Sequence, residues 1–249
     1  MVRPVLLKLG GSVITDKSGH GKFRKPATKR LTGELAKVQV PCVLFHGAGS
    51  FGHPEAAKHA LGRRQAKTEG VAEVLARAGA LHAHVVEVAA AAGLKPLSFP
   101  IHLSAVSEGG RLHDLPVERI HRALEDGFTP VLGGTLVRDD EWGWRVASAD
   151  EQMAELAHDL DPRLAVFCTD VDGVYGDGGV MAVCGPEHLD DLAVLGAQGD
   201  DVTGRMNGKL ERAFQIAGCC PTWIISGEAR GRLFDVLRGK PVLGTRIQV

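Results

Sequence analysis

Short apolar segments alternate along the chain with longer segments whose apolar residues recur at helical spacing. The short segments predict buried strands at Val5–Leu9, Val40–Phe45, Leu94–Phe99, Thr129–Leu132, Leu164–Cys168 and Thr222–Ile225. The longer segments predict helices at Thr28–Val38, Thr68–Ala92, Pro116–Asp126, Asp150–Leu160, Thr203–Ala217 and Arg230–Leu237. Strands that alternate with helices indicate an α/β fold, in which a largely parallel sheet carries helices on both faces.

Two further segments extend this picture. The segment Thr135–Val146, with Asp139-Asp140 near its middle, predicts a β-hairpin on the α/β body. The longest predicted helix, Thr68–Ala92, carries an apolar stripe that includes Val74 and Ala78. Such a stripe usually packs into the core, but it could also form one wall of an apolar substrate pocket. The pattern alone leaves both interpretations open.

The composition is that of an ordinary globular protein. The chain has 249 residues, of which 44% are hydrophobic and 24% charged, and its formal net charge is −1. That charge provides no bulk field to attract nucleic acid or an acidic membrane. The N-terminal apolar run is too short for a signal peptide, and no stretch approaches the ~20 apolar residues that span a bilayer. We therefore expect a cytoplasmic protein without a membrane or nucleic-acid partner.

The cysteines and histidines do not predict a metal site. The five cysteines lack C-x-x-C spacing and their number is odd, so we expect small buried thiols in a reducing cytosol rather than zinc ligands or disulfides. His82 and His84 are two residues apart on a predicted helix and would point to different faces, which makes them a poor pair of metal ligands.

A candidate anion site begins at the end of the first predicted strand, where Lys8 precedes the turn Gly10-Gly11-Ser12. A lysine in a buried strand is costly unless it meets a negative charge. The two glycines allow close backbone approach and expose amide N–H groups suited to phosphate oxygens. The Walker A pattern is absent. The alternative is a tight turn beside a surface lysine. Lys17 follows five residues after Ser12, and for Lys17 taken alone this alternative is favoured.

A second candidate follows the next predicted strand, where the stretch from His46 to His53 reads HGAGSFGH. Gly47, Gly49 and Gly52 permit backbone conformations that side chains forbid. We expect a helix to begin at His53, with its first N–H groups directed at a bound anion. A lone histidine is more often structural or exposed, but one among such glycines has better odds of touching the ligand.

Two weaker signals lie in the second half of the chain. Asp170, Asp172 and Gly173 follow the strand Leu164–Cys168, at the strand end where ligands gather in open α/β sheets. They could hold a nucleotide or a Mg²⁺ shell, or form an ordinary Asp-rich turn. Farther on, Thr203 is a plausible helix N-cap. Lys209 falls off the apolar stripe of that helix and is free to reach a phosphate, although any helix has an exposed lysine.

The chain resembles the amino acid kinase superfamily in four motifs, which occur there in the same order: Lys8-Leu9-Gly10-Gly11-Ser12, the glycine-rich stretch from His46, Thr169-Asp170-Val171-Asp172-Gly173-Val174 and Asp201-Val202-Thr203-Gly204. The resemblance spans essentially the whole chain. Within that superfamily, Ser50-Phe51-Gly52-His53-Pro54 and Lys17 are similar to the isopentenyl phosphate kinases. The fosfomycin kinases share part of the pattern and are the nearest alternative.

The resemblance implies a three-layer αβα sandwich that forms a single domain over residues 1–249. An N-terminal lobe, residues 1–160, would bind the phosphoryl acceptor, and a C-terminal lobe, residues 161–249, would bind ATP. The resemblance also implies Mg²⁺, a homodimer, and phosphorylation of isopentenyl phosphate to isopentenyl diphosphate in isoprenoid biosynthesis.

The resemblance also assigns roles to single residues. By motif match, Lys8, Lys17 and Lys209 would contact the phosphates, His53 would bind the acceptor, and Asp150 would orient the lysines. The residues expected beside ATP are Lys8, Gly10, Gly11, Ser12, Gly49, Asp170, Gly173, Gly204, Arg205 and Lys209. Those expected beside the acceptor are Gly47, Ala48, Gly52, His53 and Ala149. No residue is assigned to direct metal coordination.

Three positions depart from the superfamily pattern. Ala48 stands where many members have a glycine, as do Ala149 and Arg205. The Arg205 change bears on the backbone contact to the nucleotide, for which a guanidinium near phosphates could substitute. Two other functions stay open: a kinase of this fold that acts on fosfomycin or another small phosphonate or phosphate, and a regulatory protein that binds nucleotide without turnover. The joint presence of lysines and His53 at the matched positions argues against the second.

Overall fold

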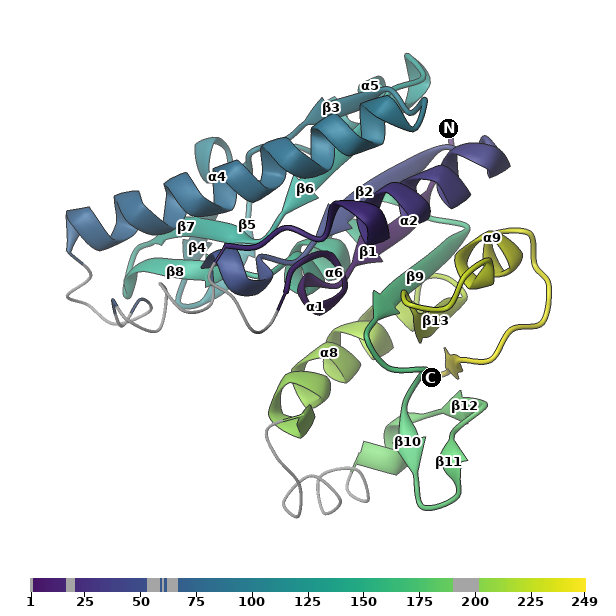
Figure 1. Cartoon of the computed structure of the whole chain (residues 1–249). Coiled ribbons are helices and arrows are strands. Elements are labelled where there is room, and N and C mark those ends of the chain that lie inside the picture. The colour runs from purple at the N-terminus through teal and green to yellow at the C-terminus, as the bar shows by residue number, and fades with distance from the viewer. Residues whose placement is uncertain (1, 17–20, 53–58, 60, 62–66, 190–201) are drawn as a thin grey trace.

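An eight-stranded sheet runs through the whole molecule, with helices packed on both faces (Figure 1). This computed structural model describes residues 2–16, 21–52, 59, 61, 67–189 and 202–249, with the backbone alone for residues 202–207. The strand order is β12-β14-β13-β9-β1-β2-β6-β3. The bounds of these strands are β1 Val5–Leu9, β2 Cys42–His46, β3 Pro96–Ser98, β6 Thr129–Gly133, β9 Leu164–Thr169, β12 Val183–Cys184, β13 Thr222–Ser226 and β14 Thr245–Ile247.

The sheet is largely parallel, as the alternating pattern predicts. The central strand β1 pairs in parallel with β2 on one side and with β9 on the other, and β13 and β6 continue the parallel pairing outwards. Only the pair of β13 with β14 is antiparallel among the pairs of this sheet that the structure describes. All five residues of β1 are buried, which explains why its sequence is a continuous apolar run interrupted only by Lys8.

Two hydrophobic cores lie on opposite faces of this sheet because successive side chains of a strand point in opposite directions. Leu7 and Leu44 pack on the face covered by α2 (Lys25–Val38), α4 (Thr68–Ala91) and α9 (Arg232–Leu237). Leu6 and Phe45 pack on the face covered by α5 (Val117–Glu125), α6 (Ala149–Leu160) and α8 (Val202–Ala217). The expected three-layer αβα sandwich is therefore confirmed.

A small second sheet, with the order β5-β4-β7-β8, lies beside the main one. Its strands β7 (Thr135–Asp139) and β8 (Gly143–Ala147) form the predicted antiparallel hairpin. Its other strands, β4 (Val106–Glu108) and β5 (Arg111–His113), were not predicted, nor were the separate two-stranded sheet of β10 (Tyr175–Gly176) and β11 (Gly179–Val180) and the main-sheet strands β12 and β14. Runs of two or three residues are too short to show a period of two. Two 3₁₀ turns cover Ile101–Leu103 and Pro186–His188.

Several helix starts differ from the expectations. A short helix α1, Gly11–Ile14, was not predicted and begins directly after Gly10 in the turn that follows Lys8. Residues 49–52 already form a helical turn, before the expected start at His53; His53 itself lies outside the described residues. Helix α8 already includes Val202, so Thr203 lies within the helix and the prediction that it caps the helix is wrong.

Helix α4 is long enough and apolar enough in composition to span a membrane, contrary to the expectation from the sequence. In the folded molecule it lies along the sheet, with Leu81 and Val85 fully buried in the core that it shares with α2 (Figure 1). A core helix passes the same test of length and composition. The packing accounts for the apolar stripe on one side of the helix.

We expect the substitution Leu81→Ala to lower the free energy of unfolding by about 2–5 kcal/mol, because it removes a fully buried side chain from between α4 and the sheet. Chemical denaturation with urea measures this difference. The matched control is Lys29→Arg at an exposed position of α2 on the same face of the sheet, which should stay within about 0.5 kcal/mol of the parent. Equal stabilities for the Leu81 variant and the parent would contradict the core position of α4.

Candidate functional site

The carboxyl ends of the central parallel strands meet at one edge of the sheet, and the predicted motifs lie there. Strand β1 leads into Gly10, β2 into Gly47, β6 into Gly134 and β9 into Asp170. The amide of Gly10 donates to the carbonyl of Cys168 at 2.8 Å, which holds the turn after β1 against the end of β9. This edge is where open α/β folds bind their ligands.

The two glycine-rich turns contact each other backbone to backbone. A Cβ atom on Gly11 would lie 2.5 Å from the amide nitrogen of Gly49, and one on Gly47 would lie 2.7 Å from the amide nitrogen of Gly11. Gly49 has a φ of +49°, which favours glycine. Thr15 joins the turns further, because its hydroxyl donates to the Gly11 carbonyl at 2.7 Å and accepts from the Ser50 amide at 3.0 Å. Only residues without side chains fit at these contacts.

The residues expected beside the acceptor converge on a third glycine. A Cβ atom on Gly134 would lie 3.4 Å from the Ala48 amide nitrogen and 3.7 Å from that of Ala149. A small apolar pocket opens beside them, and its lining residues come from the glycine-rich turn, α4 and the hairpin: Ala48, Gly52, Val74, Ala78, Gly134, Thr135, Leu136 and Val146. The stripe of α4 therefore serves both the core and a pocket wall, the two possibilities that the pattern left open.

Asp150 brings together two lysines that are far apart in the sequence. Its carboxylate forms ion pairs with Lys8 of β1 and with Lys209 of α8, the second at 3.6 Å. The Lys209 ammonium also lies 5.7 Å from the centre of the Phe167 ring, within the range of a cation–π contact. Lys8 is 95% buried, so its charge needs this partner. The three side chains carry a net positive charge, which suits an anionic ligand.

Burial and mutual attraction shift the pKa values of this cluster. Burial lowers the pKa of Lys8 to about 7, with the attraction of Asp150 opposing the shift and the repulsion of Lys209 adding to it. Burial would raise the pKa of Asp150, but the charges of Lys8 and Lys209 outweigh it and hold that pKa below its usual value. Asp150 thus stays ionised and serves as a fixed negative charge between two cations, rather than as a proton donor.

Helix α6 presents Asp150 from its first turn. Ser148 is the N-cap, and its hydroxyl accepts from the Glu151 amide at 3.1 Å. The positive end of the helix dipole favours the negative charge of Asp150 at this position. Ala149 is buried in the same turn, facing Gly134. A side chain larger than alanine would reduce the space near that glycine.

The acidic turn after β9 is occupied by contacts within the protein. Asp170 accepts a hydrogen bond from the Ser12 hydroxyl at 2.8 Å, which brings these two predicted nucleotide contacts together. Asp172 pairs with Arg232 at 2.5 Å. A Cβ atom on Gly173 would lie 2.5 Å from the Thr245 hydroxyl, so close packing on β14 already explains that glycine. Among the described residues no three His, Cys, Asp or Glu side chains form a cluster that could hold a metal ion.

Some of the predicted residues cannot be placed. Lys17 and His53 lie outside the described residues. Gly204 and Arg205 belong to the first turn of α8, but the described part of the chain includes only their backbone. Their expected contacts with the phosphates and the nucleotide stay predictions. The structure thus brings together Lys8, Asp150 and Lys209, and separately the glycine turns with Ala48 and Ala149.

Sequence reasoning missed residues that hold these groups in place. Thr15 and Gly134 are common residue types without a motif, although the pair Gly133-Gly134 at a strand end was a usable signal. His46 was counted only as the start of a glycine-rich stretch. Its Nε2 atom lies 2.9 Å from Nδ1 of His82, and burial, with the His82 ring adding to it, lowers the pKa of His46 to about 3. His46 is therefore a neutral anchor beneath the turn.

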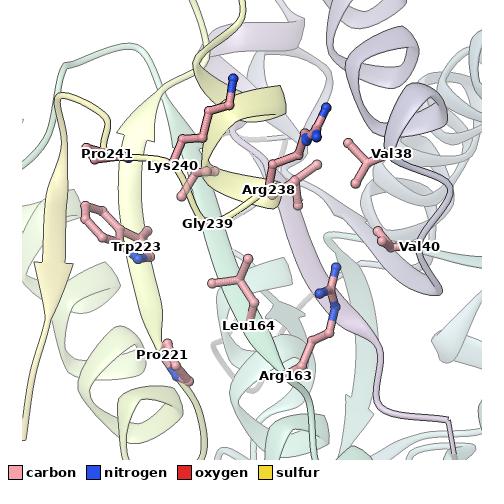
Figure 2. Close-up of a pocket in the computed structure, with 12 residues that line it drawn as sticks. Val38, Val40, Arg163, Leu164, Pro221, Trp223, Arg238, Gly239, Lys240 and Pro241 are labelled. Atoms are coloured by element: carbon pink, nitrogen blue, oxygen red, sulfur yellow. The ribbon is translucent and has the colours of Figure 1, made fainter.

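A hollow of about 770 Å³ lies at the opposite edge of the sheet (Figure 2). Leu164 and Trp223 form its floor near the starts of β9 and β13, and Arg163, Arg238 and Lys240 rise around it. Helices α2 and α9 end beside it, and cations are favourable at helix C-termini. The positive charges around the hollow therefore stabilise the ends of these two helices. The hollow is remote from the strand ends that carry the motifs.

Residues 3–226 of the chain match the model of the amino acid kinase family. The isopentenyl phosphate kinase of Methanothermobacter thermautotrophicus is 32% identical, and the alignment covers 98% of each chain. The isopentenyl phosphate kinase of Thermoplasma acidophilum is 31% identical over 93% of this chain and 95% of its own.

Solved structures agree with the sequence similarity. A structure of isopentenyl phosphate kinase superposes with a TM-score of 0.85 at 27% identity and covers 99% of this chain and 100% of its own. The substrate complex of an isopentenyl phosphate kinase superposes with a TM-score of 0.79 at 29% identity and covers 98% of this chain and 100% of its own.

The contact between the glycine turns predicts that alanine destabilises the protein at Gly11 but not at Gly33. We expect Gly11→Ala to lower the free energy of unfolding by about 1–3 kcal/mol, because its Cβ would force backbone segments apart. The control is Gly33→Ala in helix α2, where the Cβ meets open space and the helix should gain up to about 1 kcal/mol. Urea denaturation of both variants measures the difference; a Gly11 variant as stable as the Gly33 variant would disprove the close approach.

The buried cluster predicts an unusual titration of Lys8. In protein with ¹³C-labelled lysine, the Lys8 signal, assigned with Lys8→Arg, should titrate with a pKa of about 7 rather than the ordinary 10.5. Asp150→Asn should lower this pKa further, since the carboxylate favours the charged lysine. Added ATP should raise it for the same reason. A Lys8 signal that titrates together with the exposed lysines would show that the ammonium is not buried in this cluster.

Proposed function

Since this chain belongs to the amino acid kinase family and, within it, groups with the isopentenyl phosphate kinases, we propose that it transfers the γ-phosphoryl group of ATP to isopentenyl phosphate and forms isopentenyl diphosphate. One observation of the structure carries this proposal. Lys8 of the central strand and Lys209 of α8 meet at Asp150, on the face of the sheet that α6 and α8 cover, next to interlocked glycine turns. That arrangement suits two phosphate groups that must come together.

Phosphoryl transfer depends on alignment and on neutralised charge more than on covalent help from the protein. Both reactants are anions, so they repel each other unless cations lie between them. Lys8 and Lys209 supply two cations, and Asp150 keeps them at one place despite their mutual repulsion. The glycine turns bring backbone amides close to the same point, where side chains would block a phosphate.

The transfer needs no general base from the protein. A phosphate monoester has its second pKa at about 6, so the acceptor is mostly a dianion at neutral pH and is already nucleophilic. One of its oxygens forms the new bond to the γ-phosphorus, while the bond from that phosphorus to the bridging oxygen breaks and ADP leaves. His46, which stays neutral and buried under the turn, is not placed to accept a proton from the acceptor.

The residues outside the described part take their proposed roles from the family resemblance. His53 would donate a hydrogen bond to the acceptor phosphate, and Lys17 would neutralise the charge of the phosphoryl group in transit. Gly204 and Arg205 would lie beside the nucleotide, together with Asp170 and Ser12, which contact each other at the end of β9.

The apolar pocket gives the acceptor's hydrocarbon tail a place. Val74 and Ala78 of α4 line this pocket together with Leu136 and Val146 of the hairpin. Ala48 of the glycine-rich turn lines the same pocket, and the acceptor phosphate would lie at that end. The pocket is small, which favours a short branched tail over a long prenyl chain. Larger or smaller side chains at Val74 or Val146 would therefore change the preferred length.

The described residues do not fit a direct metal site. The carboxylate of Asp150 is paired with two lysines, and that of Asp172 is paired with Arg232. Mg²⁺ would therefore reach the site on the phosphates of ATP, whose charge it would help to neutralise, and neither of these two paired carboxylates would hold it in place. The protein's own contribution to the neutralised charge comes from the lysines.

Three broader features complete the proposal. Residues 1–160 would form the acceptor lobe and residues 161–249 the ATP lobe, which is supported by the position of β1 between β2 and β9. A homodimer would cover the exposed side of α4, where Ala76, Ala80 and Ala83 offer a smooth face. The protein would work in the cytoplasm, where ATP and a small phosphorylated acceptor are available.

A panel of acceptors tests the proposed function. With purified protein, ATP and Mg²⁺, we expect ADP release to be fastest with isopentenyl phosphate, slower with dimethylallyl phosphate and geranyl phosphate, and slowest with fosfomycin. Lys8→Met should lower the rate by about 10²–10³-fold, because one positive charge beside the moving phosphoryl group is lost. Faster turnover of fosfomycin would favour the alternative kinase, and ATP binding without ADP release for any acceptor would favour a regulatory protein.

A further inference from the structure

We propose that the buried ion pair between Arg145 and Glu151 is a positioning element for phosphoryl transfer, a role that rests on the proposed function. It fixes the first turn of α6, so that Asp150 holds Lys8 and Lys209 at one point. Neither Arg145 nor Glu151 belongs to the motifs that identify the family, and neither touches the lysines in the described structure. Their effect on the reaction is therefore indirect.

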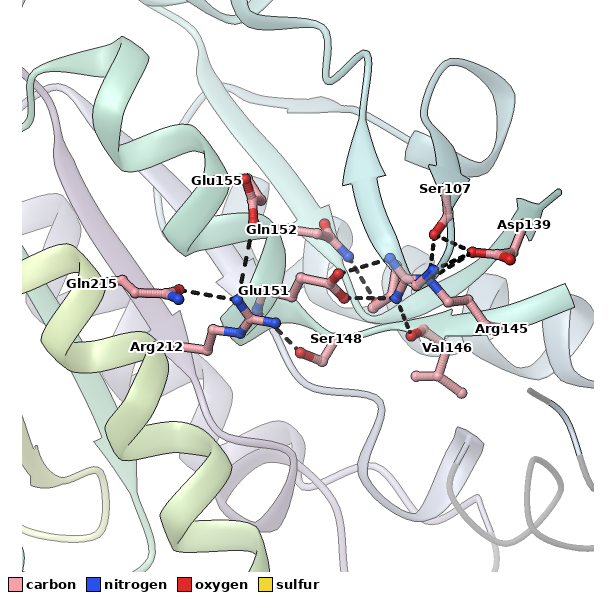
Figure 3. A network of polar contacts seen from close by, with 12 residues as sticks. Ser107, Asp139, Arg145, Val146, Ser148, Glu151, Gln152, Glu155, Arg212 and Gln215 are labelled. Atoms are coloured by element: carbon pink, nitrogen blue, oxygen red, sulfur yellow. Dashed lines mark hydrogen bonds and ion pairs between the residues drawn. The ribbon is translucent and has the colours of Figure 1, made fainter. Parts of the chain in front are cut away.

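The pair has the geometry of a rigid clamp (Figure 3). The Arg145 guanidinium meets the Glu151 carboxylate with two parallel contacts, at 3.0 and 2.7 Å. Both residues are only 6% exposed. A bidentate contact of this kind fixes both the distance and the relative orientation of the two planar groups.

The rest of Arg145 is held by the hairpin and its neighbour strand. Its Nε atom donates to the Ser107 hydroxyl at 2.5 Å, and Nη1 also donates to the Val146 carbonyl at 3.0 Å. Asp139, which is fully buried, lies 3.7 Å from Nε and accepts from the Ser107 hydroxyl at 2.6 Å. Figure 3 shows Ser107 and Asp139 on one side of the guanidinium and Glu151 on the other. The arginine therefore has no freedom to follow a displaced helix.

The clamp acts on Asp150 through its neighbour in the chain, Glu151. Glu151 follows Asp150 directly in the first turn of α6, and the N-cap Ser148 accepts from the Glu151 amide. Gln152 adds a second tie, since its amide nitrogen donates to the Gly133 carbonyl at 2.9 Å and to the Ala147 carbonyl at 3.1 Å. The start of the helix is thus fastened to the hairpin and to the end of β6. A shift of this turn moves Asp150 against Lys8.

Stability alone gives a poor reason for such a cluster. Removing charges from water costs free energy, and well-packed apolar side chains of similar volume often stabilise a protein as well as a buried ion pair does. An apolar contact would hold α6 against the hairpin, but it would allow sliding and rotation. The bidentate ion pair excludes these movements, and a misplacement of about 1 Å is enough to slow a reaction that depends on alignment.

The variant Glu151→Gln tests the proposal, because it keeps the shape of the side chain and removes its charge. We expect kcat to fall by about 10- to 100-fold while KM for ATP changes little, since the displaced Asp150 no longer aligns the lysines. In ¹³C-lysine spectra the pKa of Lys8 should fall below that of the parent protein, because the carboxylate that favours the charged form has moved away. The second readout needs no acceptor, so it holds even if isopentenyl phosphate is not the substrate.

Two further variants make the result decisive. Arg138→Gln, an exposed arginine on the same hairpin, is the matched control and should leave kcat and the Lys8 titration unchanged. If Glu151→Gln does not fold, the double variant Arg145→Met with Glu151→Met replaces the clamp by apolar packing and should fold but show the same two effects. A stable variant of either kind with the parent's kcat and the parent's Lys8 titration would overturn the proposal. So would a loss of kcat without any change in that titration.

Discussion

The attraction of one carboxylate for two ammonium groups organises this molecule around its site. Lys8 lies in the central strand and Lys209 in a helix near the other end of the chain. Their ammonium groups repel each other, and the carboxylate of Asp150 between them compensates this repulsion. The cost of burying Lys8 is tolerable only because that carboxylate stays ionised. The polar clusters around the start of α6 are best understood as supports for this single point.

The place where the two lysines meet Asp150 also explains why small residues gather at this edge of the sheet. A site that receives two phosphate groups needs amides and space, and side chains remove both. Gly11 and Gly47 let two turns approach until their backbones touch, and Gly134 leaves room for Ala48 and Ala149. The sheet supplies the convergence because parallel strands end at a common edge, whereas the opposite edge carries cations that complement helix C-termini.

The described site has two parts that differ in chemistry. Polar contacts dominate where Ser12 meets Asp170, and apolar side chains dominate where α4 faces the hairpin. The hairpin serves both purposes, because one of its faces lines the apolar pocket while Arg145 reaches the helix that carries Asp150. The apolar pocket and the support of the lysine cluster thus share one structural unit.

The layers of the fold and the residue types of the site are already readable in the sequence. Its alternating periods predict the parallel sheet and the helices, because burial on two faces imposes continuous apolar strands. The lysine before Gly10-Gly11 marks an anion site because lysine is rarely buried without a reason. Which distant groups meet became clear only from the packing of the elements. Local patterns carry no information about pairs such as Arg145 with Glu151 or Thr15 with Ser50, since these contacts depend on how hairpin, turns and helix pack in three dimensions.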